Sequence, residues 1–151
     1  MIYYRNDVRR SGVDGRALVA AAKRLMAAVG EHDSALSLSL VGDEAIRALN
    51  REYRGRDTPT DVLSFPLDDS RDPAVPERLL GDVVISVETA RRQAAGYDAP
   101  LQRELYRLLI HGVLHLKGHD HVERSERRVM EREERRLADA IELPWPYATR
   151  R

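Results

Sequence analysis

The first third of the chain alternates between strand-like and helix-like patterns of apolar residues. Residues 2–5 are typical of a short strand, and residues 14–29 repeat apolar positions at a helical interval. Leucine alternates with serine over residues 36–40, which indicates a strand with one buried face. Asp43 then suits the N-cap of a second helix that carries further apolar residues up to position 53.

The rest of the chain continues the same alternation. The expected elements are a strand at 62–65, a strand at 83–87, a helix at 88–95, a helix at 100–116 and a last helix at 124–143. Residues 67–78 are polar, rich in Asp and Pro, and predict a loop. These elements predict one α/β (α+β) domain over residues 1–151, with a small mixed four-stranded sheet covered by helices.

The helix at 100–116 ends in the run His-Gly-Val-Leu-His-Leu-Lys-Gly-His-Asp-His, from His111 to His121. Residues four apart lie on one face of a helix, so the imidazoles of His111 and His115 can converge on one metal ion. Gly118 suits a left-handed turn that ends the helix and returns His121 to the same ion. The pattern predicts a metal site at the end of a central helix.

Four of the five histidines fall within this run, which leaves open a His-rich tract that binds metal loosely. The regular apolar pattern of the preceding helix favours an ordered metal site over such a tract. Three histidine ligands leave a fourth position for water, as catalytic zinc sites do. His119 is the weakest candidate ligand because it lies inside the turn, where it either supports the site or faces solvent.

Gly112 distinguishes this run from the metallopeptidase signature H-E-x-x-H. In that signature the residue after the first histidine is the glutamate that acts as general base. The glycine removes this carboxylate from the helix. A zinc-peptidase mechanism is therefore disfavoured, although a carboxylate from elsewhere in the chain could serve.

The histidine run resembles the signature of the YbeY family, bacterial rRNA maturation factors described as metal-dependent endoribonucleases. Residues 49–66, LNREYRGRDTPTDVLSFP, are similar to that family's central segment, and residues 80–86, LGDVVIS, resemble its next strand. The resemblance implies that His111, His115 and His121 bind one Zn²⁺ per chain and that Arg54 is a functional cation near it. His119 stands where the family usually has an aromatic residue, commonly Tyr.

Composition narrows the function classes. No cysteine is present, which excludes disulfides, cysteine–zinc sites and thiol catalysis. A net charge of +0 argues against a protein that grips long duplexes through phosphates. No apolar segment resembles a signal peptide or a membrane span, so we expect a cytoplasmic protein without a membrane partner.

Several arginines precede the strand at 62–65. We interpret Arg47 and Arg51 as a solvated helix face and assign Arg54 and Arg56 to substrate phosphate, mainly on the family resemblance. The charge-rich last helix is interpreted as a solvated surface held by pairs of opposite charge.

These features support a zinc-dependent endoribonuclease that acts on single-stranded RNA in rRNA processing. The resemblance further implies maturation of the 16S rRNA 3′ end, ribosome quality control, and small-subunit ribosomal proteins and a ribosome-associated GTPase as partners. A non-catalytic zinc-binding ribosome-assembly factor is the alternative, and a fourth protein ligand on the metal would favour it. Hydrolysis of another substrate, such as a peptide or a small phosphoester, is the third hypothesis.

Overall fold

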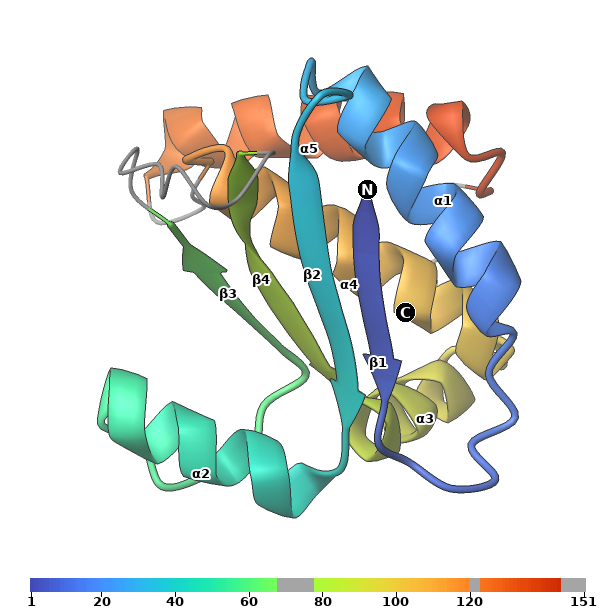
Figure 1. Cartoon of the computed structure of the whole chain (residues 1–151), viewed down its shortest axis with the longest axis vertical. Helices are drawn as coiled ribbons and strands as arrows, with labels where there is room; N and C mark the ends of the chain where they lie inside the picture. Colours follow the sequence, from blue (N-terminus) through green and yellow to red (C-terminus); the bar gives the residue numbers. More distant parts are fainter. Residues whose placement is uncertain (68–77, 120–122, 145–151) are drawn as a thin grey trace.

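A mixed β-sheet forms the centre of the protein (Figure 1). The computed structural model describes residues 1–67, 78–119 and 123–144. Within these ranges the strands are β1 (Ile2–Asn6), β2 (Ala35–Val41), β3 (Val62–Pro66) and β4 (Leu79–Ser86). The sheet order is β1-β2-β4-β3; β1, β2 and β4 run parallel, and β3 runs antiparallel to β4. The strand β3 therefore lies at an edge of the sheet.

Helices cover the sheet. They are α1 (Gly15–Ala28), α2 (Asp43–Arg54), α3 (Val87–Gly96), α4 (Leu101–Leu116) and α5 (Arg124–Ala140). The most central is α4, which passes behind the sheet in Figure 1 and packs against β3, β4, α1, α3 and α5. Among the described residues, no helix has both the length and the apolar character needed to cross a membrane.

The main core lies between α4 and the sheet, and the alternation in β2 explains it. Leu36, Leu38 and Leu40 are fully buried on the face toward the main core, while Ser37 and Ser39 between them are half-buried. A smaller apolar cluster lies between α2 and the sheet; its buried members are Val41, Ile46, Leu63 and Val84. Successive residues of a strand point to opposite faces, so both faces of the sheet contribute apolar contacts.

The predicted mixed sheet covered by helices is confirmed, with local corrections at the ends of elements. Strand β4 begins at Leu79 rather than 83, because it continues along β2 through an irregular register near Ala35, and it ends at Ser86 because Val87 begins α3. The last helix, predicted to reach residue 143, ends at Ala140. The N-cap of α2 is Gly42, not Asp43; the Asp43 carboxylate instead accepts hydrogen bonds from Ser86 at the start of α3. The predicted loop falls largely on residues 68–77, outside the described residues, and a domain spanning 1–151 stays a prediction.

Helix α4 approaches the sheet most closely at Gly112. A Cβ atom built on Gly112 would lie 2.7 Å from Cγ1 and 3.0 Å from Cγ2 of Val83 on β4. Such separations are shorter than van der Waals contact, so only glycine fits between helix and sheet here. A glutamate at this position, as in the peptidase signature, would force the helix away from the strand. The absence of that carboxylate therefore has a packing reason.

We expect Gly112→Ala to destabilise the metal-free protein by about 1–2 kcal/mol, because an overpacking cost of about 2–3 kcal/mol outweighs the roughly 1 kcal/mol gain in helix propensity. Urea unfolding measures the change. Gly96→Ala is the matched control, since Gly96 is also helical and a Cβ there meets nothing within 4 Å. Equal stability changes for the two variants would contradict close packing at Gly112.

Candidate metal centre and active site

His111 and His115 lie one turn apart on α4, and their rings face the same region. The ring centroids are 6.5 Å apart, with 21° between the planes. The His111 side chain is 24% exposed, so the ring remains accessible from outside. Two imidazoles one turn apart on one helix face are placed to offer two nitrogens to one metal ion, for which the side chains have to converge further than they do here. The third predicted ligand, His121, lies outside the described residues, and no cluster of three metal-binding side chains is formed within them.

Helix α4 ends in the left-handed turn that the sequence predicted. Gly118 adopts the left-handed conformation, with φ of +88°. Its N–H donates to the His115 carbonyl at 3.0 Å, and the N–H of His119 donates to the Leu114 carbonyl at 3.0 Å. Together these two bonds make a Schellman motif, which satisfies the last carbonyls of the helix. The predicted return of His121 to the other histidines lies outside the described residues and stays a prediction.

A buried acid on α5 faces the first histidine. Oε2 of Glu134 lies 3.4 Å from Nε2 of His111, and the Glu134 side chain is only 10% exposed. Burial raises the pKa of this carboxyl to about 7, with Arg107 opposing the shift and Glu131 adding to it. A carboxyl group held against a histidine fixes the orientation of the ring. Glu134 is therefore part of the site.

Ser64 on β3 connects the predicted cation to the histidine helix. Nη2 of Arg54, the last residue of α2, donates to the Ser64 carbonyl at 3.0 Å. The hydroxyl of the same serine is buried and donates to the Gly112 carbonyl at 3.1 Å. Gly112 lies between the two histidines in the sequence, so Arg54 is linked to their helix through a single residue.

The turn after α2 is held by its own contacts. Arg47 binds Asp57 through two bonds, Nε to Oδ1 at 2.9 Å and Nη2 to Oδ2 at 3.2 Å. The Asn50 side chain donates to the Thr58 carbonyl at 2.9 Å. Arg47 is thus an anchor of the turn rather than only a solvated charge. Arg56 sits within this turn with an exposed side chain, so its predicted role toward phosphate stays a prediction.

A buried charge network fixes the C-terminal end of the histidine helix, next to the histidines. Glu31 is 8% exposed and lies after α1. Its carboxylate accepts hydrogen bonds from Lys117 Nζ at 2.6 Å, from Arg78 Nη1 at 2.8 Å and from the Ser34 hydroxyl at 2.7 Å. Burial alone would raise the pKa of Glu31, but the bonds from Lys117 and Ser34 outweigh it and lower this pKa. Lys117 immediately precedes Gly118, so the network holds the turn that leads to the third predicted ligand.

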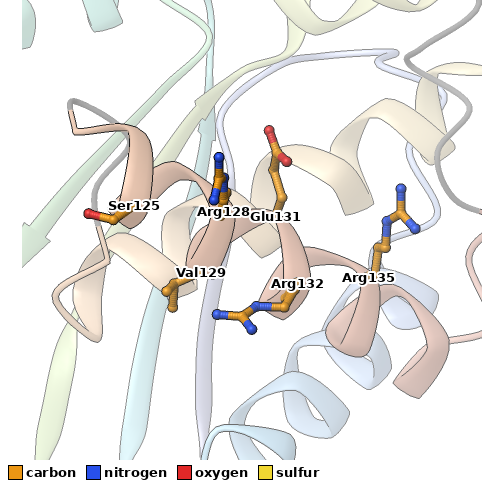
Figure 2. Close-up of a pocket in the computed structure, with 6 residues that line it drawn as sticks. All are labelled: Ser125, Arg128, Val129, Glu131, Arg132 and Arg135. Atoms are coloured by element: carbon orange, nitrogen blue, oxygen red, sulfur yellow. The ribbon is translucent and has the colours of Figure 1, made fainter.

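An open hollow of about 570 Å³ lies along α5. Figure 2 shows the side chains that line it. It is lined by Ser125, Arg128, Val129, Glu131, Arg132 and Arg135. All of these belong to one helix, and neither Arg54 nor the histidines take part. A hollow along one helix surface does not gather groups from several elements as a reaction site does. We therefore place the candidate site at the histidine face of α4.

The structure places His111 and His115 on one face of α4 and links Arg54 to that helix through Ser64. The roles predicted for these three residues stay predictions. Sequence reasoning left the role of Ser64 open and missed Glu134. Both had a signal: strand alternation turns Ser64 toward the main core, and Glu134 shares the apolar face of α5. The predicted solvated surface of α5 holds for its exposed Glu133–Arg136 pair but not for Glu134.

We expect Glu31→Gln to lower the free energy of unfolding by about 1–2 kcal/mol at pH 7, because two cations lose their buried partner while remaining partly hydrated. The folded-state pKa of Glu31 lies below its ordinary value of 4.5, so this stability is present above that pH. It is lost as the pH falls through the lowered pKa.

Urea titrations of both proteins at neutral pH and near pH 4 measure this effect. Asp33→Asn, in the same loop but with a 91% exposed side chain, is the control and should match wild type. A difference between Glu31→Gln and wild type that stays constant as the pH falls would contradict a role for the ionised carboxylate.

Known proteins are similar to this chain over most of its length. The sequence profile of the family described as "Endoribonuclease YbeY" matches residues 5–142. A protein named Endoribonuclease YbeY from Carboxydothermus hydrogenoformans is 50% identical over 108 residues, covering 72% of this chain and 73% of the relative. Another of that name from Desulfitobacterium hafniense is 42% identical over 139 residues, covering 89% and 88%.

A solved structure shows the same fold. The solution structure of TM1509 from Thermotoga maritima matches with a TM-score of 0.63 and 27% identity, covering 93% of this chain and 89% of that one. The family match begins near the end of β1 and covers β2, β3, β4 and the described helices α1 to α5. The chain belongs to the Endoribonuclease YbeY family.

Proposed function

We propose that this protein is a zinc-dependent endoribonuclease that cleaves single-stranded RNA during rRNA processing. The observation that carries the proposal is the link from Arg54 through Ser64 to the turn of α4 that bears two histidines. It joins a cation suited to phosphate with a pair of imidazoles suited to a metal. Family membership supports the class of reaction.

His111, His115 and His121 would hold the zinc ion. The two described imidazoles share one helix face, and the left-handed turn at Gly118 ends that helix three residues before the third predicted ligand. The sequence contains no cysteine, so histidine supplies the soft donors that zinc prefers. When bound, zinc lowers the pKa of a coordinated water to about 7 and polarises a phosphoryl oxygen.

Arg54 would bind the phosphate that is being cleaved. A guanidinium has five N–H donors in a planar fork, and the bond to the Ser64 carbonyl holds one of its nitrogens in place. The remaining donors can contact the oxygens on which negative charge grows in the transition state. Because this bond already orients the guanidinium, less free energy is needed to orient it during the reaction.

Ribosomal RNA is the proposed substrate, including the 3′ end of 16S rRNA, with ribosome quality control as a related role. Small-subunit ribosomal proteins and a ribosome-associated GTPase are the proposed partners, in the cytoplasm. The net charge of +0 fits a protein to which a ribosomal complex presents the strand, because such a protein need not hold long RNA by charge alone.

Cleavage of a labelled single-stranded RNA tests this function. We expect Arg54→Ala to bind zinc normally but to lower kcat about 10²–10³-fold, as loss of one charge-stabilising donor does. His115→Ala should lose both zinc and cleavage. Metal content is measured on each preparation by elemental analysis.

Arg51→Ala is the matched control, because Arg51 is an exposed arginine on the same helix, and it should keep near wild-type kcat. Equal cleavage by all four proteins would identify a contaminating ribonuclease and contradict the assignment. Zinc binding without cleavage by wild type would favour the assembly-factor hypothesis.

Glu134 gives a separate test of the metal site. Replacing it with leucine should weaken zinc binding about 10–100-fold, because the His111 ring loses its buried polar partner. Glu134→Gln keeps an oxygen at that place and should retain most of the affinity. Competition with a zinc-binding dye measures both. Unchanged affinity in the leucine variant would show that the contact does not position the ligand.

A further inference from the structure

Two aromatic rings meet on the surface next to Arg54. Tyr53 on α2 and Phe65 on β3 have ring centroids 5.2 Å apart and planes at 64°, an edge-to-face contact. The Tyr53 residue is 59% exposed. Leu67, just after β3, is 46% exposed. Edge-to-face contact holds the two rings relative to each other and leaves much of the tyrosine facing solvent.

These rings directly adjoin residues of the proposed active site. Tyr53 precedes Arg54 in α2, and Phe65 follows Ser64 in β3. Alternation along β3 turns Ser64 toward α4, where it bonds Gly112, and turns Phe65 toward the small cluster under α2. Ser64 and Phe65 thus point to opposite faces of the sheet, but both lie on β3 at the same edge of it.

The charge around the rings is positive and exposed. Arg54 and Arg56 both lie within three residues of Tyr53, and both have exposed side chains. Within the described ranges, neither of them forms an ion pair within 4 Å. An exposed aromatic surface bordered by arginines is complementary to single-stranded nucleic acid, in which bases alternate with phosphates.

We propose that Tyr53, supported by Phe65, stacks on a base of the single-stranded RNA substrate while Arg54 holds the adjacent phosphate. This inference rests on the proposed nuclease function and adds the position of one nucleotide to it. The chemical class recognised is the flat face of a base, without selection by hydrogen bonds. Recognition of this kind tolerates different sequences, since every base has such a face.

Binding of a short labelled RNA tests the stacking. The full chain carries His115→Ala, which the proposed function expects to prevent cleavage, and affinity is measured by fluorescence anisotropy. Adding Tyr53→Leu should weaken binding roughly fivefold to tenfold, because leucine keeps apolar area but has no aromatic face. Adding Tyr53→Phe should leave the affinity unchanged. An abasic strand should bind the parent and the leucine variant equally.

Tyr3→Leu is the matched control, because Tyr3 is 49% exposed but lies on β1, at the opposite edge of the sheet. It should leave RNA affinity unchanged. Equal affinity of the Tyr53→Leu variant and its parent would overturn the stacking, and would leave the rings as a contact for another protein. Failure of the parent to bind RNA would also overturn it; cleavage by wild type in the separate assay would then show that the nuclease function stands without it.

Discussion

The close approach of α4 to the sheet at Gly112 determines the geometry of the whole site. With no side chain between the helix and Val83, the turn carrying both histidines lies directly against β4. The same approach brings the Gly112 carbonyl within reach of the Ser64 hydroxyl on β3. Glycine in a helix costs about 1 kcal/mol relative to alanine, and here the cost is offset by contacts that alanine would prevent.

Charged groups are buried at the two places where α4 meets other parts of the chain near the site. Glu31 is matched by two cations and a hydroxyl, so its ionised form is stabilised and the turn after α4 is fixed. Fewer positive charges act on the Glu134 carboxyl, so burial dominates and raises its pKa to about 7. The bonds to Glu31 make the turn after α4 rigid. The carboxyl of Glu134 can instead gain or lose its proton when a ligand binds beside it.

The elements with long and regular apolar patterns were predictable from the sequence, and so was the placement of His111 and His115 on one face of a helix. The start of β4 was not, because Gly81 interrupts the alternation and the pairing with β2 passes through an irregular register. Asp43 has the residue type of an N-cap, but contacts with α3 place it one position further into the helix. Such outcomes depend on tertiary contacts that no local pattern contains.

The same reason explains what was missed at the site. The partners of Glu31 lie 47 and 86 residues away along the chain, so no local pattern reveals them. Glu134 was concealed by the charge of α5, although its spacing from Met130 and Leu137 places it on the buried face. In a helix so rich in charge, the period of the few apolar residues is a better guide than its composition.

The central claim is that α4 presents histidines to a zinc ion that keeps an open position. X-ray absorption spectroscopy of the zinc-loaded protein tests it most directly. The account predicts three imidazole nitrogens and one oxygen from solvent, at about 2.0–2.1 Å from the metal. Four imidazole nitrogens, with His119 completing the shell, would contradict it and indicate a closed, structural site.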